Sequence, residues 1–417
     1  MKDLLLRIIF CACLCCSNIC AAFDLDLAEA EQLWQQKNRE LKTAADQIHG
    51  AVADKLSAAQ RPNPQLSLNT TSIQTGDPGF IKQADSIIRI DQIIERGDKR
   101  ALRERAASLR LDASQDDLSD AQRQGLVALY RAYYDVVLAQ QQLQIARENA
   151  QLSAQMLMAA QWRLKAGDVA RADVDRLQVD MLRAEDDAQQ AKNNLLQMQL
   201  ALAYQLGLES QASALHASAH WPAVEVMPAQ PIFAVEQRAD VLAAEKRAQA
   251  AQTAFEQAQA LRKRDVTVGM QVEHNGQNRP LNTVGIGVSV PLMTGYEYAG
   301  EIAHARADLE LADDALDQTR ARALIEIQKA FADLMAAREQ IQRFDNELLQ
   351  AAQRALDAAE FAYKHGAGGI MDVLDARRTH KAILNDAASA HANYAKALAT
   401  WHFVNSPFCG TSSCDVQ

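Results

Sequence analysis

The 417-residue sequence is poor in the residues that interrupt helices or fill a compact mixed core. It has only 9 proline and 17 glycine residues, and aromatic residues make up 5% of it. Alanine, glutamine, leucine and aspartate are abundant instead. This balance favours long helices over a compact mixed globule, although the length alone would allow two or three domains.

Signatures of catalysis are also missing. The sequence contains no GxSxG, HExxH or P-loop pattern and no paired CxxC, so we expect neither an enzyme nor a bound cofactor. His216 and His220 are four residues apart, a spacing that suits a metal on one helix face. Pro222 beside them indicates an irregular connector instead, and two ligands alone bind a metal weakly. We therefore predict no metal site.

Cysteine is scarce outside the first 20 residues, which hold five of the seven cysteines. The other two, Cys409 and Cys414, stand in the C-terminal tail. In an oxidising compartment they could form a small disulfide. A metal pair is the alternative, but the two thiols lack other nearby ligands. A disulfide or no role is therefore favoured over a metal.

Long apolar runs are confined to the first 22 residues. Two basic residues stand near the start, an apolar run covers residues 4–16, and small residues end the segment. This pattern is typical of a secretory signal, and we predict cleavage after Ala22. The run is too short for a retained membrane anchor. A lipoprotein signal is disfavoured because Ile19, rather than a small residue, precedes Cys20.

The remaining chain offers no stretch of 18 or more apolar residues, so we predict no transmembrane helix in the mature protein. Without the leader it has 41 basic and 52 acidic residues, a net charge of −11. An acidic balance of this size argues against a nucleic-acid partner.

The sequence repeats itself. "WRLKAGDVARADV" (162–174) and "AYKHGAGGIMDVL" (362–374) align when Gly167 is set over Gly366, 199 residues later. Lys165 then falls on Lys364, and Asp173 on Asp372. Self-similarity at a fixed spacing indicates two copies of one structural plan.

Each copy reads as a helix, two strands, a very long helix, a glycine turn and a return helix. Proline-free stretches of nearly 70 residues predict helices of roughly 100 Å, and their apolar residues recur with coiled-coil spacing. The expected helices are 27–59, 98–165, 171–206, 232–263, 296–364 and a last one ending near 404, and the expected strands are 65–73, 84–94, 265–274 and 283–292. The predicted domains are a signal peptide (1–22), a first repeat (23–206), an irregular connector (207–231), a second repeat (232–404) and a tail (405–417).

Alternation is clearest in the strand at 283–292. Its bulky apolar residues point to one face and its glycine and serine residues to the other (Val284, Ile286, Val288, Val290 and Leu292 against Gly285, Gly287 and Ser289). One apolar face and one small or polar face is what a membrane barrel needs. A soluble sandwich is the alternative, but four strands make a poor sandwich core and the helices are too long to cover them.

Four strands cannot close a barrel alone, and open sheet edges are not tolerated in lipid. Closure must come from several chains. Three copies would supply twelve strands and twelve helical columns joined by coiled-coil seams. The predicted fold class is therefore mainly α: a long coiled-coil α-barrel with a 12-stranded membrane β-barrel, completed by a homotrimer with four strands per chain.

These features resemble the TolC family of outer-membrane efflux proteins over nearly the whole mature chain. The resemblance is carried by "YKHGAGGIMDVLDARR" (363–378), "WRLKAGDVARADV" and "VSVPLMTG" (288–295). "QIIERGDKRALR" (92–103) is similar to the matching segment of the branch that serves cobalt–zinc–cadmium and related heavy-metal pumps. The family implies a trimeric duct of the Gram-negative outer membrane that extends into the periplasm. It docks on a periplasmic adaptor, the membrane fusion protein, and an inner-membrane RND pump.

The resemblance also implies a gate at the periplasmic tips. Asp372 and Asp375 match the aspartates that narrow the tube, and Tyr363 and Asp173 match a latch between neighbouring hairpins. Gly368 replaces an arginine of the family's type member, so the latch is expected to be weaker or built differently. Asp173 and Asp372 are also suited simply to cap a helix N-terminus.

The glycine turns are expected to form the tips that contact the adaptor, through Lys165, Gly167, Lys364 and Gly366. The alternative for the two lysines is that they merely solvate the last helical turn. Two rival functions stay open at this point. One is a periplasmic coiled-coil adaptor or scaffold without a barrel, and the other is a duct for drugs or for type I protein secretion.

Overall fold

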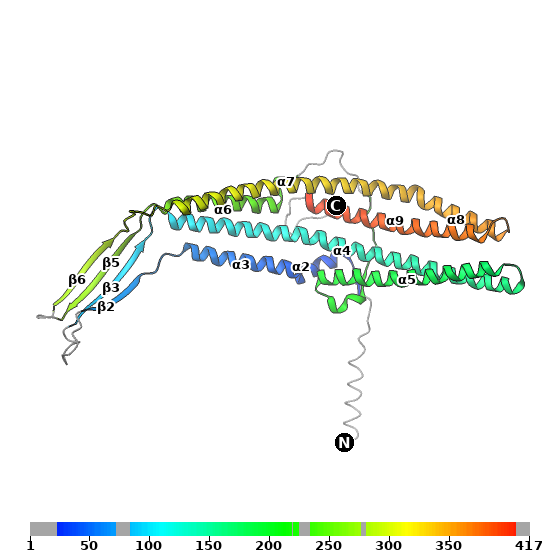
Figure 1. Ribbon diagram of the computed structural model, residues 1–417, viewed down its shortest axis with the longest axis horizontal. Coiled ribbons are helices and arrows are strands. Elements are labelled where there is room, and N and C mark those ends of the chain that lie inside the picture. Colours follow the sequence, from blue (N-terminus) through cyan, green and yellow to red (C-terminus); the bar gives the residue numbers. More distant parts are fainter. Residues whose placement is uncertain (1–22, 72–83, 219, 225–233, 277–280, 406–417) are drawn as a thin grey trace, which may run out of the picture. The chain divides into compact units, whose positions relative to one another are not determined.

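The computed structural model describes residues 23–71, 84–218, 220–224, 234–276 and 281–405 (Figure 1). The predicted signal peptide, Cys409 and Cys414 lie outside these residues. Internal contacts divide the chain into two units. The hairpin unit contains the described residues of 1–42, 121–234 and 325–406, and the sheet unit those of 43–120 and 235–324.

Long helices dominate the described chain. The helices are α2 (Leu27–Lys37), α3 (Arg39–Ala59), α4 (Lys99–Ala166), α5 (Arg171–Leu206), α6 (Ala239–Ala260), α7 (Ala299–Arg343), α8 (Leu349–Lys364) and α9 (Ile370–Asn405), with short 3₁₀ turns η2 (Glu209–Ala214) and η3 (Val235–Gln237). The strands are β1 (Phe23–Leu25), β2 (Gln65–Thr71), β3 (Asp85–Ile94), β4 (Leu215–Ala217), β5 (Val266–Asn275) and β6 (Leu281–Ser289). Each half of the chain therefore runs helix, two strands, long helix, return helix; the internal repeat itself stays a prediction.

Helix α4 continues for 68 residues because no proline interrupts it, and its one glycine has a packing reason. Gly125 faces the ring of Trp34, and a Cβ at position 125 would overlap that ring. Trp34 is only 1% exposed, so it cannot move aside easily. A residue that weakens helices is thus used here to let an indole approach the backbone.

The helix expected to run unbroken from residue 27 to residue 59 is in fact two helices. The chain becomes extended at Asn38, between α2 and α3. The Asn38 side-chain oxygen accepts hydrogen bonds from the backbone N–H groups of Glu40 (2.9 Å) and Leu41 (3.1 Å). Asparagine therefore caps a new helix instead of continuing the old one.

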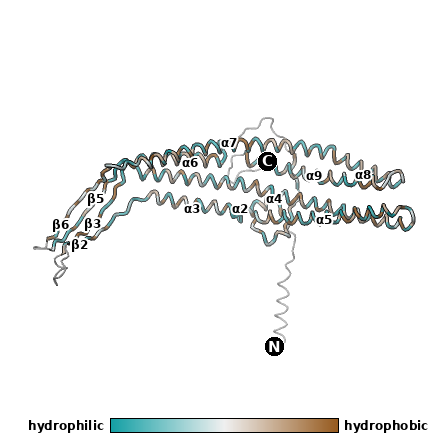
Figure 2. The backbone as a smooth tube through the Cα atoms, viewed as in Figure 1, coloured by the Kyte–Doolittle hydropathy of each residue, from teal (hydrophilic) through white to brown (hydrophobic). Residues whose placement is uncertain are grey.

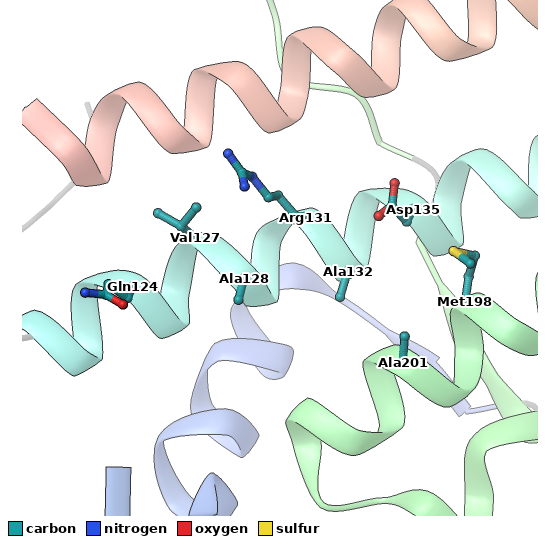
Figure 3. A pocket seen from close by; sticks show the side chains of 8 residues that line it. All are labelled: Gln124, Val127, Ala128, Arg131, Ala132, Asp135, Met198 and Ala201. Atoms are coloured by element: carbon teal, nitrogen blue, oxygen red, sulfur yellow. The ribbon is translucent and has the colours of Figure 1, made fainter. Parts of the chain in front are cut away.

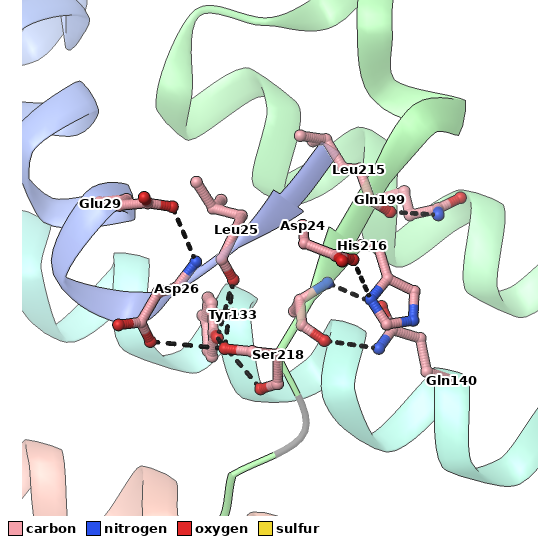
Figure 4. Close-up of polar contacts among 11 residues, drawn as sticks. Asp24, Leu25, Asp26, Glu29, Tyr133, Gln140, Gln199, Leu215, His216 and Ser218 are labelled. Carbon is pink, nitrogen blue, oxygen red and sulfur yellow. Dashed lines mark hydrogen bonds and ion pairs between the residues drawn. The ribbon is translucent and has the colours of Figure 1, made fainter. Parts of the chain in front are cut away.

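The connector predicted to be irregular begins with ordered structure. After η2, strand β4 pairs in parallel with β1, joining Leu25 to Ala217 (Figure 4). Gln140 of α4 both donates to and accepts from the backbone of Ala217, at 2.8 and 2.9 Å. The Tyr133 hydroxyl lies 3.1 Å from the Leu25 carbonyl oxygen and 2.9 Å from Ser218 Oγ. These bonds hold the first described residues against the middle of α4.

A π-helical turn (η4, Phe344–Leu348) interrupts the helix expected at 296–364 and separates α7 from α8. Within this turn, Phe344 packs on Ala387 and Ala390 of α9. Asp345 in the same turn accepts from His391 Nε2 at 3.1 Å. The turn therefore adjusts the register of α7 and α8 against α9.

In the sheet unit, four strands pair antiparallel in the order β2-β3-β5-β6. Helices α6 and α7 pack through small and aliphatic residues (Val241, Ala244 and Ala248 on α6; Leu316 and Ala323 on α7). The four strands confirm the number expected, with boundaries no more than three residues from those predicted where the structure describes both ends.

The two faces of the sheet differ sharply in chemistry. Paired residues across the strands share a face, so the register gives one apolar face and one polar face. The apolar face carries Leu66, Leu68, Ile88, Ile90, Val268, Met270, Val272, Val284, Ile286 and Val288, of which Ile286 is 88% exposed. The other face carries mainly serine, threonine, asparagine, glutamine, glycine and charged residues, together with Ile87, Ile93 and Leu281, and is called the polar face below.

Hydrophobic and hydrophilic residues are interleaved along the long helices (Figure 2). Among the described residues, no helix combines the length and the apolar character needed to cross a membrane.

Candidate functional site

The two helical hairpins of the hairpin unit, α4–α5 and α8–α9, end in the same turn. Gly167 (φ 86°) and Gly366 (φ 75°) both adopt the left-handed conformation. In each turn the glycine N–H bonds back three residues, and the following N–H bonds back five, to Arg163 and Ala362 (2.9 and 2.8 Å). This is the Schellman arrangement that ends helices at glycine. The structure thus gives the two matching sequences the same local geometry.

An apolar cluster joins the hairpins just inside these turns. Its buried members are Leu157 and Ala160 of α4, Val174 and Leu177 of α5, and Ile370 and Leu374 of α9. Tyr363 of α8 packs against the cluster and is half-buried. All four tip helices therefore contribute to one core.

Polar ties cross the same junction. Arg163 Nη1 of α4 donates to the Tyr363 hydroxyl at 3.2 Å, and the Arg163 guanidinium lies 5.6 Å from the centre of the tyrosine ring. Arg378 of α9 donates to Asp180 of α5 at 3.0 Å, and Ser153 of α4 donates to the same carboxylate at 3.2 Å. Asp180 thus connects three helices, with only 18% of its side chain exposed.

The predicted gate residues are placed as follows. Within one chain, the described contacts of the Tyr363 hydroxyl are with Arg163, whereas Asp173 pairs with Arg176 at 3.3 Å. The Tyr363–Asp173 latch implied by the resemblance is therefore not made among the described residues of one chain. Asp372 accepts the backbone N–H of Gly369 at 2.9 Å, which is a capping bond.

Asp375 is exposed one turn further along α9. The tip lysines are exposed as well: Lys165 Nζ lies 5.1 Å from the Trp162 ring centre, and Lys364 lies 3.9 Å from Glu360. Sequence reasoning missed three residues that tie the hairpins together, namely Arg163, Asp180 and Arg378. The one sequence signal for these three residues is that they are charged residues of opposite sign on helices expected to pack as a coiled coil.

Comparison with known proteins shows a likeness to one family. Residues 233–401 match the model of the outer membrane efflux protein family. The resemblance recognised in the sequence is thereby confirmed. The proteins that this chain is similar to are channel proteins of efflux ducts rather than enzymes.

One curated relative of this chain is the cobalt-zinc-cadmium resistance protein CzcC of Cupriavidus metallidurans. It is 25% identical over 367 residues, which cover 86% of this chain and 84% of CzcC. Two solved structures share the fold. VceC of Vibrio cholerae has a TM-score of 0.76 at 18% identity and covers 92% of this chain and 96% of its own. The CmeC outer membrane channel of Campylobacter jejuni has a TM-score of 0.77 at 15% identity, over 93% and 87%.

Further along the hairpin unit, helix α4 carries a tyrosine cluster. Tyr130 donates to the Glu31 carboxylate, and its ring meets Phe403 edge-on at 5.1 Å. Burial raises the pKa of Tyr130 well above its usual value, and the bond to Glu31 raises it further. Burial, with a smaller effect of Tyr133, raises the pKa of Tyr134 to about 12.

A shallow hollow of about 370 Å³ lies between α4 and α5 (Figure 3). It is lined mostly by small or aliphatic residues, and its two charged residues already have partners on α9. Arg131 extends toward α9 and donates to Thr400 at 3.2 Å, while Asp135 accepts from Lys396 at 2.8 Å. The hollow thus offers no converging polar groups to hold a small ligand.

Within the residues that the structure describes, no cluster of three or more histidine, cysteine or acidic residues could hold a metal ion. His216 instead pairs with Asp24 of β1 at 3.0 Å.

Proposed function

We propose that three copies of this chain form the outer-membrane exit duct of a tripartite efflux system. An inner-membrane RND pump supplies the energy, a periplasmic adaptor joins pump to duct, and heavy-metal cations are the cargo. The observation that carries the proposal is the exposed apolar face of the sheet. It is backed by a polar face and bounded by β2 and β6, each of which pairs with one strand only among the described residues.

The sheet supports membrane insertion on physical grounds. Ile286 is 88% exposed and Leu66 71% exposed, in a row with Ile90 and Met270. Such a face is costly in water but suited to lipid. Within the described part of the chain, β2 and β6 each pair on one side only, and lipid cannot satisfy the backbone groups of their outer edges, so neighbouring chains must pair with them. Three chains would supply twelve strands.

The tips support docking in the periplasm. Two Schellman turns per chain would place six equivalent turns at the end of a trimer. Lys165, Gly167, Lys364 and Gly366 form the exposed ends of these turns and are the proposed contact with the adaptor.

The proposed gate lies one to two helical turns inside the tips. Three copies each of Asp372 and Asp375 would concentrate negative charge around the axis, which attracts cations. The contacts of Tyr363 with Arg163, and of Asp180 with Arg378, hold the two hairpins of one chain together and so favour a closed tip. Asp173, which is half-buried and pairs with Arg176 in its own helix, would have to exchange this partner to bind Tyr363 of a neighbouring hairpin.

The cargo is proposed from the likeness to CzcC and to the heavy-metal branch at "QIIERGDKRALR". In the structure, the charged residues of this segment make contacts that stabilise the fold. Arg103 donates to Glu95 (2.9 Å) and to the carbonyl oxygens of Ala58 (2.9 Å) and Gln60 (3.0 Å). Lys99 donates to Asp265 at 2.8 Å. The motif therefore secures the passage from β3 into α4, and the proposed cargo passes without being bound there.

A deletion strain tests the cargo. Growth would be measured with zinc, cobalt, cadmium and copper salts and with common antibiotics, and compared with the strain carrying the gene on a plasmid. We expect lowered tolerance to at least one of these metals, restored by the plasmid. Unchanged metal tolerance together with increased antibiotic sensitivity would replace metal export by drug export.

A further inference from the structure

The polar face of the sheet carries one ion pair that lies over glycine residues. Arg89 and Asp91 both stand on β3 and point to this face, and Arg89 Nε lies 2.9 and 2.7 Å from the two carboxylate oxygens of Asp91. Arg89 Nη1 also lies 3.4 Å from Gln271 Oε1 on β5. Arg89 is the one lysine or arginine in the described residues of the four strands.

Glycines clear the space in which this pair lies. Gly269 stands directly across from Asp91 on β5, and Gly287 stands beside Gly269 on β6. A Cβ at position 269 would overlap the Asp91 carboxylate, whereas a Cβ at position 287 would sit 3.6 Å from the Arg89 guanidinium. The pair therefore lies flat along the sheet, with side chains only 34% and 23% exposed.

When Asp91 neutralises the charge of Arg89, the charge that remains on the polar face is negative. The other charged residues of the polar face are Asp85 and Glu273, which are both acidic. A charge-assisted hydrogen bond from the guanidinium to a carboxylate places a negative charge directly beside the positive one and so offsets it. The position of Asp91, set by the missing side chain at Gly269, thus decides whether a cation is displayed.

We propose that Asp91 is a specificity-determining residue of the duct: by holding Arg89 flat over Gly269, it keeps the barrel wall free of an exposed positive charge, so that cations leave unhindered. The inference rests on the proposed function, because the polar face lines a lumen only if the chains close into a barrel. In a trimer the three pairs would lie at one height and form a ring. Without Asp91, that ring would display three guanidinium groups.

Ion selectivity of the reconstituted trimer tests this. The reversal potential is measured in planar bilayers under a KCl gradient, with Asp372→Asn and Asp375→Asn present throughout so that the tip charges do not dominate. Asp91→Asn should lower the potassium-to-chloride permeability ratio severalfold. Gly269→Ala should lower it in the same direction, because the added methyl group displaces the carboxylate.

Two further variants provide the controls. Gly287→Ala makes only an ordinary van der Waals contact with Arg89 and should leave the ratio unchanged. Arg89→Gln should leave the permeability ratio at or above that of the protein in which Arg89 and Asp91 are both kept. This variant keeps the test decisive if Asp91→Asn does not assemble. Conducting trimers whose ratio is the same with Asp91→Asn, or a ratio that falls with Arg89→Gln, would overturn the inference and leave the proposed duct intact. Failure of the unsubstituted protein to form conducting trimers would instead overturn the duct itself.

Discussion

Arg378 donates a hydrogen bond to Asp180 across 3.0 Å, and this contact joins the last helix, α9, to α5 of the first hairpin. Asp180 also accepts from Ser153 of α4. One carboxylate thereby holds two hairpins whose sequences are far apart. Any opening of the tip that separates the hairpins of one chain must break this contact, together with that between Arg163 and Tyr363.

Removing these ties should loosen the tip. We expect Asp180→Asn combined with Tyr363→Phe to raise the single-channel conductance of the reconstituted protein severalfold. Contacts of this partly exposed kind contribute about 1 kcal/mol each, and three chains would lose them together. Glu310→Gln on α7, whose side chain pairs with Arg306 at an exposed site, serves as the control. An unchanged conductance in the double variant would show that the ties do not limit opening.

Two substitutions of Asp372 distinguish a role in gating the channel from a role in capping helix α9. Asp372→Asn removes the charge but keeps an oxygen that can accept the Gly369 N–H, whereas Asp372→Ala removes both. If Asp372 is a gate residue, both variants should reduce the cation selectivity of the channel. If it only caps α9, the asparagine variant should match the unsubstituted protein, and only the alanine variant should lose stability in thermal unfolding followed by circular dichroism.

The close approach of Trp34 to Gly125 predicts a destabilising alanine. Gly125→Ala should cost about 1–3 kcal/mol, because the indole is 1% exposed and has no room to retreat. Gly50→Ala in α3 is the matched control, since nothing lies within 4 Å of an added Cβ there. That variant should be neutral or more stable by up to about 1 kcal/mol. Thermal unfolding measures both, and equal melting temperatures would contradict the packing account.

The buried tyrosines predict alkaline sensitivity. The pKa of Tyr134 is raised to about 12 and that of Tyr130 is raised as well, above the ordinary value of about 10. Their neutral forms therefore favour the folded state below about pH 10, and this contribution is lost as the pH rises toward and past 12. Tyrosinate absorbance and circular dichroism should show unfolding in that range. Tyr134→Phe should make stability depend less steeply on pH there, and an unchanged slope would argue against the assignment.

The sequence predicted those features that rest on long, regular patterns. Helix α5 begins and ends where the glycine turn and Gly207 placed it, and alternation located all four strands of the sheet. It missed β1 and β4, because three residues are too few to alternate and their partners lie about 190 residues apart. It also missed the break at Asn38, although asparagine before a charged helical turn is a capping signal.

The tip was predictable only in part, for a related reason. Both glycine turns follow from local sequence, because Gly167 and Gly366 supply the left-handed residue that ends a helix. The contact of Arg163 with Tyr363 depends instead on how two hairpins pack, and no local pattern specifies which of several basic residues will reach the hydroxyl. The predicted partner, Asp173, came from resemblance and pairs within its own helix.

The central claim is that several chains together complete one membrane wall. It is tested most directly by washing outer membranes with carbonate and running the retained protein, unboiled and then boiled, on SDS gels. We predict that the protein stays with the membranes and migrates as a trimer that heat dissociates. A mature protein that washes off and behaves as a monomer without detergent would contradict the account.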